Sequence, residues 1–467
     1  MTEPSGAHRG DAGGAQLVSL RRPADGLLAR LALIASAERT IDLQYYLWDS
    51  DEVGHLMITR LLSAADRGVR IRVLVDDLKL RKRTYSIASL CRHPNLEIRV
   101  FNPWLKRSSA AGQAYEFIRR FQVLDLRTHN KLLVADGRRA IFGCRNIAAE
   151  HFGLGKTFNL VDYDMLVSGR NVSEAAEIFE TYWRSPSTAS GTSFNVGVSD
   201  DDLAATRASI AQELENCLPT LSTVLRDEDG WDERSAALRF PIAGGAVRVV
   251  SDRPGVSPLS QRTQVIDALH AAVDGAQRDL VVATPFFVPS EVQVDWYRRM
   301  IDRGVRIRVL TNSLASNQGT ISNSGLKKQR RAMVKAGIEL HELRTDAADK
   351  SEWDTPPREA RYLGLHAKLC VIDRERVFLG AVNLDPRSRY INTEIGALID
   401  NPEFAADAAD GILELMTPDN AWRVELGGDG RLRWLSSTTT ARRQPARGMM
   451  QRLVDAALGF LPVRKYT

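Results

Sequence analysis

Two short segments of the chain carry the same reactive residue types at the same spacing. Each has a histidine, a lysine two residues later and an aspartate five residues after the lysine. These residues are His129, Lys131 and Asp136 in the first segment and His366, Lys368 and Asp373 in the second. An imidazole can attack an electrophile or transfer a proton, and an ammonium group neutralises an anion. Two such pairs therefore suit attack on an anionic phosphodiester without a metal ion.

The repetition is too specific to be accidental. For eight histidines, with roughly one chance in twenty at each fixed position, about 0.02 matches are expected. The likeness continues downstream, because Gly143-Cys144-Arg145-Asn146 and Gly380-Ala381-Val382-Asn383 each begin seven residues after a motif aspartate. Residues 303–310 also repeat residues 67–74 letter for letter, at an offset of 303 − 67 = 236, and the motif histidines are 366 − 129 = 237 apart. A nearly constant offset indicates that one domain was duplicated.

The duplicated motif resembles the signature of the phospholipase D superfamily. Two longer stretches are similar to the bacterial cardiolipin synthases, the C type in particular: residues 129–152, and residues 383–388 followed by Asn392-Thr393-Glu394. The resemblance covers nearly all of residues 16–465. Cys144 and Ala381 stand where the family usually has a second Gly or Ser. Both replacements are small, so we expect the turn to be kept.

The resemblance implies a role for the motif residues. His129 would attack phosphorus and form a phosphohistidine, and His366 would protonate the leaving alkoxide and then deprotonate the incoming alcohol or water. Spacing alone does not tell which histidine attacks. The two motif lysines would hold the non-bridging oxygens, and Asn146 and Asn383 would donate further hydrogen bonds to them.

Four carboxylates are associated with this site. The resemblance suggests Glu394 and Asp162 as the groups that fix the tautomers of the histidines. Asp136 and Asp373 belong to the motif itself. They follow each lysine at opposite strand parity, at the end of an apolar run that is typical of a buried strand, and this favours a structural over a chemical role.

The other histidines are assigned to the core or the surface: His8, His55, His93, His151, His270 and His341. The sequence has no HExxH or comparable metal spacing, no Walker loop and no dinucleotide fingerprint. We therefore predict an enzyme that uses no cofactor.

Alternating patterns predict the elements that position these residues. Apolar residues recur at helical spacing over 24–37, a strand is expected over 41–47, a helix over 55–66 and a strand within 67–77. The second half repeats this order. We predict an α/β protein of two duplicated phospholipase D-like sandwich lobes, related by a pseudo-twofold axis, with the active site at their interface. A monomer then suffices for catalysis.

Composition suggests the boundaries of the lobes. Residues 1–15 are predicted to be a disordered tail, 16–184 lobe 1, 185–239 a linker and helical connection with a helix over 203–217, 240–430 lobe 2, and 431–467 a basic tail. The apolar and basic residues of this last segment allow two interpretations. The segment lies on an anionic bilayer, or it packs back on its own domain.

Net charge and cysteine content bear on the binding partners and the cellular compartment of the protein. The net charge is +5 and the pI is about 9.0, which fits surplus surface arginine as well as attraction to phospholipid headgroups or nucleic acid. Four scattered cysteines provide no disulfide framework and fit a reducing compartment. We find no signal peptide and no apolar run of membrane-spanning length. We therefore expect a cytoplasmic enzyme on the inner face of the bacterial cell membrane.

The function predicted from the sequence is that of a phosphatidyltransferase acting on a phospholipid at an anionic membrane surface. A phospholipase D hydrolase with water as acceptor would use the same intermediate. A nuclease is the alternative in substrate class, but the two longer stretches favour lipid, so no nucleic-acid partner is expected. The two intact His-Lys pairs argue against a non-catalytic binding module.

Overall fold

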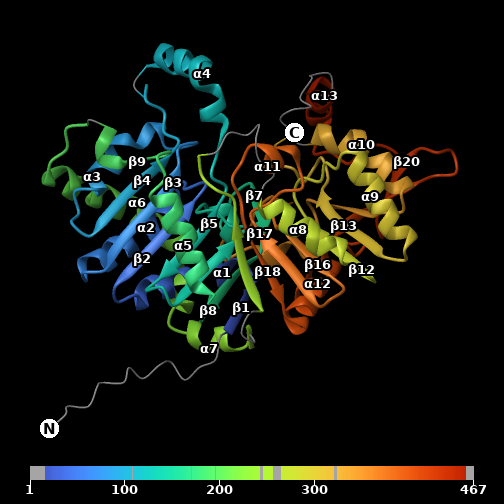
Figure 1. Cartoon of the computed structure of the whole chain (residues 1–467), viewed down its shortest axis with the longest axis horizontal. Coiled ribbons are helices and arrows are strands. Elements are labelled where there is room, and N and C mark those ends of the chain that lie inside the picture. The colour runs from blue at the N-terminus through green and yellow to red at the C-terminus, as the bar shows by residue number, and fades with distance from the viewer. Residues whose placement is uncertain are drawn as a thin grey trace, which may run out of the picture.

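The computed structural model describes residues 16–107, 109–169, 171–194, 196–241, 246–255, 264–319 and 323–458. The predicted N-terminal tail, residues 1–15, and the last part of the basic tail, residues 459–467, lie outside these ranges. Two α/β lobes stand side by side, one from each half of the chain (Figure 1).

Lobe 1 contains a mixed sheet with the strand order β10-β1-β8-β6-β5-β2-β3-β4-β9 in the described residues. Its strands are β1 (Gln16–Leu20), β2 (Thr40–Tyr45), β3 (Arg70–Asp76), β4 (Leu96–Phe101), β5 (Lys131–Ala135), β6 (Arg139–Gly143), β8 (Asp164–Ser168), β9 (Thr188–Ser190) and β10 (Arg239–Pro241). Its helices are α1 (Pro23–Ser36), α2 (Glu52–Asp66), α3 (Thr84–Leu90), α4 (Ala110–Asp125), α5 (Val172–Trp183), α6 (Asp200–Asp227) and α7 (Trp231–Ala236).

Lobe 2 repeats the scheme with the strand order β11-β18-β17-β16-β12-β13-β14-β19-β20-β21. Its strands are β11 (Val247–Ser251), β12 (Asp279–Ala283), β13 (Arg306–Asn312), β14 (Glu339–Leu343), β16 (Leu369–Ile372), β17 (Arg376–Gly380), β18 (Ile395–Asp400), β19 (Ala421–Leu426), β20 (Leu432–Leu435) and β21 (Thr440–Ala441). Its helices are α8 (Gln264–Asp274), α9 (Glu291–Asp302), α10 (Asn323–Lys335), α11 (Pro386–Tyr390), α12 (Pro402–Leu415) and α13 (Met449–Leu458).

The two sheets share one apolar core. Buried residues of β5, β6 and α5 in lobe 1 form a single cluster with buried residues of β16, β17 and α12 in lobe 2. The opposite face of the lobe 1 sheet is covered by α1, α2 and α6, and that of the lobe 2 sheet by α8, α9 and α10. Since burial of apolar area is the main source of stability, the interface is part of the fold and not a hinge surface. The predicted two-lobed α/β architecture is confirmed.

The lobes are also joined through their backbones. Strand β7 (Phe158–Val161) of lobe 1 pairs in parallel with β15 (Tyr362–Leu365) of lobe 2. Both motif histidines also form backbone hydrogen bonds to the other lobe. The His366 amide donates to the Val161 carbonyl, and the His129 amide donates to the Thr393 carbonyl. The motif strands themselves begin at Lys131 and just after Lys368. Each histidine therefore precedes its strand and lies on backbone held by the other lobe.

The segments predicted as a connection and a tail add to the two sheets. Within 185–239, β9 pairs with β4, and β10, which begins at Arg239, pairs with β1; both partner strands are in lobe 1. The helix expected over 203–217 spans Asp200–Asp227, and a capping box of Ser199 and Asp202 fixes its start. Within 431–458, β20 and β21 extend the edge of the lobe 2 sheet before α13 begins. In the described ranges, no helix has both the length and the apolarity needed to cross a bilayer.

Candidate active site

A cavity of about 310 Å³ lies between the lobes and receives side chains from both. It is at the carboxyl ends of β2 in lobe 1 and β12 in lobe 2, because Tyr46 directly follows β2 and Phe286 follows β12 by three residues. Its described lining is Tyr46, Leu47, His129, Asn146, Glu150, His151 and Leu160 from lobe 1, and Phe286, Val288, Gln318, His366, Asn383, Asp385, Arg387 and Asn392 from lobe 2. Both motif histidines and both predicted asparagines therefore meet in one cavity.

Each motif histidine is bound by a carboxylate of the opposite lobe. Nδ1 of His129 lies 2.8 Å from Oε2 of Glu394, and Nδ1 of His366 lies 2.7 Å from Oδ1 of Asp162. Both carboxylates have no exposed surface. Because Nδ1 is engaged, Nε2 of each ring is the nitrogen left for chemistry. The structure thus brings Glu394 and Asp162 to the positions that the resemblance suggested.

Backbone hydrogen bonds between the lobes explain why each histidine meets a carboxylate of the opposite lobe. Val161 and Thr393, which accept the histidine amides, immediately precede Asp162 and Glu394. One backbone hydrogen bond therefore places each histidine next to its carboxylate. The residues that precede the histidines are anchored in the same way in both lobes. The Thr128 amide donates to Asp76 at the end of β3, and the Leu365 amide donates to Asn312 at the end of β13.

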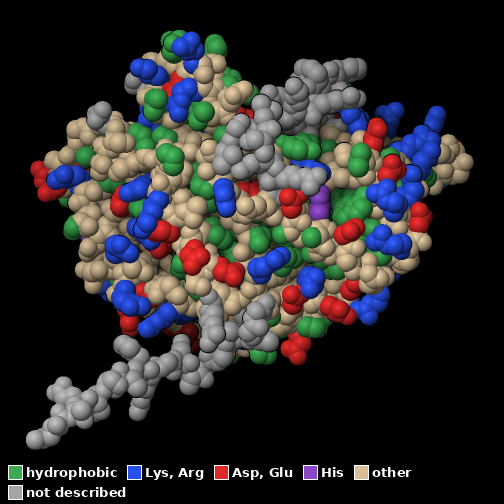
Figure 2. All heavy atoms as spheres, viewed as in Figure 1, with side chains coloured by type: hydrophobic (Ala, Val, Ile, Leu, Met, Phe, Trp, Pro, Cys, Tyr) green, Lys and Arg blue, Asp and Glu red, His purple; other side chains and the backbone are tan. Residues whose placement is uncertain are grey.

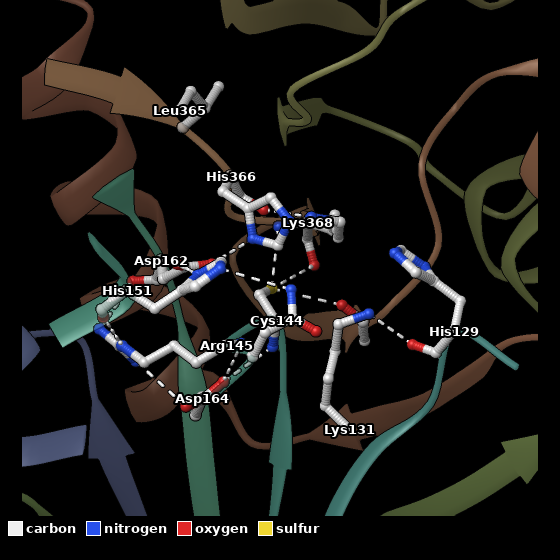
Figure 3. Close-up of polar contacts among 12 residues, drawn as sticks. His129, Lys131, Cys144, Arg145, His151, Asp162, Asp164, Leu365, His366 and Lys368 are labelled. Atoms are coloured by element: carbon white, nitrogen blue, oxygen red, sulfur yellow. Dashed lines mark hydrogen bonds and ion pairs between the residues drawn. The ribbon is translucent and has the colours of Figure 1, made fainter. Parts of the chain in front are cut away.

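Each motif lysine contacts the backbone of its own motif histidine (Figure 3). Lys131 Nζ donates to the His129 carbonyl and Lys368 Nζ to the His366 carbonyl. Both side chains are buried, and neither belongs to the described lining of the cavity. Burial, followed by repulsion from Lys368, lowers the pKa of Lys131 to about 7. Burial also lowers the pKa of Lys368.

The two asparagines line the cavity from equivalent positions. Oδ1 of Asn146 and Oδ1 of Asn383 are buried and make no hydrogen bond in the structure. Nδ2 of Asn146 lies 3.3 Å from Nε2 of His151. A buried amide oxygen without a partner is costly, so these two oxygens can accept hydrogen bonds from a ligand hydroxyl.

His151 belongs to the site, although sequence reasoning assigned it to the core or surface. Its Nδ1 lies 2.7 Å from Oδ2 of Asp162, and its ring centroid is 4.8 Å from that of His366. One carboxylate therefore holds two imidazoles. His151 follows Asn146 by five residues, as Ser388 follows Asn383, and this shared register was the available signal. It was missed because the two copies carry different residue types there.

The two histidine–carboxylate pairs differ in the direction in which the pKa of the carboxyl is shifted. Burial favours the neutral form of Asp162, but His366 and His151 outweigh it and hold the pKa of this carboxyl well below its usual range. Burial instead raises the pKa of Glu394 to about 8, against the opposing effect of Lys131. Burial and the two lysines lower the pKa of His129 well below its usual value. The pKa of His366 is lowered by burial and Lys368, with Asp162 acting in the opposite direction.

The motif aspartates lie at the far end of the motif strands. Asp136 accepts the amides of residues 38–40 at distances of 2.8–3.0 Å, and Asp373 accepts those of residues 277–279 at 2.7–2.9 Å. Both have φ near +55°, a turn conformation that aspartate tolerates better than most residues. Neither lines the cavity, so these residues join strands and do not belong to the cluster of reactive groups.

His151, Asp162 and His366 also form the one cluster in the described ranges whose donor atoms lie close enough for a metal ion, within 4.8 Å of one another. Both oxygens of Asp162, however, are at hydrogen-bond distance from ring nitrogens. These short N···O contacts are those of a carboxylate that orients two imidazoles.

Comparisons with known proteins agree with this geometry. A family model described as "Cardiolipin synthase, PLD-like domain" matches residues 31–183 and 269–415, one segment in each lobe. The chain is 30% identical over 464 residues to cardiolipin synthase C of Escherichia coli K12, covering 98% of this chain and 96% of that protein. The chain belongs to the PLD-like cardiolipin synthase family.

Other relatives agree with the assignment to this PLD-like family. Cardiolipin synthase 1 of Bacillus anthracis is 23% identical, over 81% of this chain and 62% of that protein. The crystal structure of phosphatidylserine synthase from Haemophilus influenzae superimposes with a TM-score of 0.59 at 12% identity, covering 86% of each chain, and supports the fold. The family resemblance predicted from the two motifs is confirmed, and the protein is a PLD-type enzyme.

Proposed function

We propose that this enzyme transfers a phosphatidyl group from one phospholipid to the hydroxyl of a second lipid, as a cardiolipin synthase does. The observation that carries the proposal is the pair of crossed contacts, His129 with Glu394 and His366 with Asp162, at one cavity. Two oriented imidazoles on one phosphodiester provide a nucleophile and an acid. The similarity to cardiolipin synthase C of E. coli supports the choice of substrate.

The first step forms a covalent intermediate. Nδ1–H of His129 donates a hydrogen bond to Glu394, so the lone pair of Nε2 is left to attack phosphorus, and an N–P bond forms. The P–O bond to the leaving alkoxide breaks, and Nε2–H of His366 protonates that oxygen. The buried lysines and the amides of Asn146 and Asn383 supply positive charge and hydrogen bonds toward the developing negative charge.

The second step reverses these roles. Neutral His366 takes the proton of the incoming lipid hydroxyl, whose oxygen attacks the phosphohistidine phosphorus. The N–P bond breaks and its electron pair returns to His129. A lipid acceptor gives a new phosphodiester, whereas water gives phosphatidic acid.

Electrostatics support His129 as the nucleophile. The nucleophile must start neutral, and the lowered pKa of His129 beside a carboxyl of raised pKa fits that need. The acid must hold a proton, and although burial and Lys368 lower the pKa of His366, the charged Asp162 carboxylate at its Nδ1 acts in the opposite direction and stabilises the protonated ring. No step uses a metal or another cofactor, so activity in excess EDTA is expected to equal that in buffer.

The test is incubation of the purified protein with phosphatidylglycerol vesicles, with and without phosphatidylethanolamine, followed by mass spectrometry of the lipids. His129→Ala and a parallel digest of single-stranded DNA are the controls. Cardiolipin that is absent with His129→Ala supports the transferase, and phosphatidic acid alone means a hydrolase. Cleaved DNA without lipid turnover contradicts the proposal. We further propose that the enzyme works from the inner face of the bacterial membrane, since its proposed substrates are membrane phospholipids.

A further inference from the structure

We propose that α4 and α13 form a docking face for an anionic phospholipid bilayer beside the active-site cavity. This inference rests on the proposed function, since a lipid enzyme must meet its substrate at a membrane. Both helices project from the same edge of the molecule, α4 from lobe 1 and α13 from lobe 2 (Figure 1). The docking face is Leu105, Tyr115, Ile118 and Arg119 on and beside α4, and Met449, Met450, Arg452, Leu453 and Val454 on α13.

The outer side of α4 is unusually apolar for a surface helix. Ile118 is 78% exposed, Tyr115 60%, and Leu105 in the preceding loop 67%. Only Glu116 and Leu124 of this helix are buried. Figure 2 shows apolar and basic side chains together at the tip that α4 forms. A contiguous exposed apolar surface marks an interaction site.

Helix α13 presents a second stripe. Met449 is 78% exposed, Met450 73% and Leu453 58%, and Val454 completes a set at positions i, i+1, i+4 and i+5 of the helix. The opposite side of the helix is attached to lobe 2. Gln451 donates to the Leu314 carbonyl, and Asp455 pairs with Lys327. The stripe therefore points away from the protein, as in helices that lie in a membrane interface.

The exposed charges on α4 and α13 favour an anionic bilayer over other binding partners of this face. Glu116 on α4 is turned inward, where it accepts the Leu105 and Lys106 amides. Asp455 on α13 is likewise buried. Among the charged side chains described on these helices, the exposed ones are Arg119 and Arg452. A surface of apolar groups with only positive exposed charge complements acidic headgroups and repels a second copy of itself.

Contacts connect both helices to the cavity lining. At the end of α4, Asp125 accepts a hydrogen bond from Arg387, which lines the cavity. Before α13, Arg447 donates to the Asn317 carbonyl, next to the lining residue Gln318. A bilayer seated on the two helices would thus lie at the edge of the cavity, where a lipid headgroup enters. This interpretation favours membrane contact for the part of the basic tail that the structure describes.

The test is sedimentation with vesicles of phosphatidylcholine alone or mixed equally with phosphatidylglycerol. It uses the full chain in a His129→Ala background, so that no lipid is consumed. We expect binding to the mixed vesicles only. Ile118→Glu and Leu453→Glu are each expected to weaken this binding about tenfold, because each replaces an inserted apolar side chain by a carboxylate. The matched control is Leu218→Glu, on the outer helix α6, where Leu218 is 41% exposed.

A second measurement separates docking from chemistry. With His129 intact, Ile118→Glu and Leu453→Glu should turn over a dissolved short-chain phosphatidylglycerol at the native rate, but vesicle lipid about tenfold more slowly. If native protein turns over neither lipid, the proposed function fails, while the sedimentation result still decides the docking face. Unchanged vesicle binding by both variants overturns the docking face. A native dimer that Ile118→Glu dissociates, with no vesicle binding, also overturns it.

Discussion

Glu394 Oε2 lies 2.8 Å from Nδ1 of His129, although 265 positions of the chain separate the two residues. The reciprocal contact, Asp162 with His366, spans 204 positions in the opposite direction. Neither lobe therefore contains both a motif histidine and the carboxylate that binds it. The duplication has produced a site that exists only when both halves are folded together, and one chain is enough to supply it.

Neutralising the two carboxylates should have unequal effects. Asp162→Asn is expected to lower kcat by about 10³-fold or more, because two imidazoles lose an anionic partner. Glu394→Gln should cost less, about 10–100-fold, because the raised pKa of Glu394 means that the native side chain is already protonated in part. Steady-state kinetics checks this order, with thermal melting to verify folding. Equal losses would contradict the electrostatic difference between the pairs.

The identity of the nucleophile can be tested by trapping. His366→Ala should accumulate an acid-labile phosphohistidine when given a phosphodiester with a good leaving group, since the first step then needs no acid and the second lacks its base. His129→Ala should give no adduct. Intact-protein mass spectrometry, followed by peptide mapping to residue 129, is the measurement. An adduct on His129→Ala would reverse the two roles.

Much of this site was predictable because the chain repeats it. The two motif histidines, their lysines and both asparagines follow from spacing alone, and the α/β alternation predicted the sheets. Spacing could not reveal that the carboxylates cross between lobes, because that depends on the pairing of β7 with β15. Nor did it reveal His151, whose counterpart Ser388 has different chemistry. Local patterns specify elements, whereas contacts between distant segments decide which side chains meet.

His151 should tune the pH dependence. Burial and Lys368 lower the pKa of His366 most, and His151 lowers it further, so His151→Gln is expected to raise that pKa. His366 must be protonated in the first step, and the alkaline limb of the kcat profile should move to higher pH. The matched control is Ser388→Ala, at the equivalent position of lobe 2. A lower rate with an unshifted profile would assign His151 to packing alone.

The motif aspartates should matter for stability more than for chemistry. Asp136→Asn is expected to destabilise the fold by about 1–3 kcal/mol, since the carboxylate accepts three backbone amides. The pKa of Asp136 is lowered on folding, so its contribution is complete above the unfolded value of 3.8 and is lost as pH falls through the folded value. Melting curves of native and variant protein should therefore differ above pH 3.8 and converge only as the pH falls through the lowered pKa of folded Asp136. Turnover per folded molecule should be close to native at pH 7.

The Cys144 side chain should be replaceable by serine but not by a larger group. It lies between the two motifs (Figure 3), where its sulfur accepts the Lys368 amide at 3.1 Å and is 3.3 Å from the Gly380 carbonyl. Cys144→Ser keeps both contacts and should retain activity within about threefold, because a hydroxyl also donates and accepts. Cys144→Leu adds volume to a fully buried position and should destabilise the fold by about 1–3 kcal/mol.

Burial raises the pKa of the Cys144 thiol to about 12, so thiol reagents should leave it unmodified in the native protein and label it only after unfolding. Rapid labelling of Cys144 with loss of activity, mapped by peptide mass spectrometry, would show that the lobes separate in solution and that their shared core is not permanent.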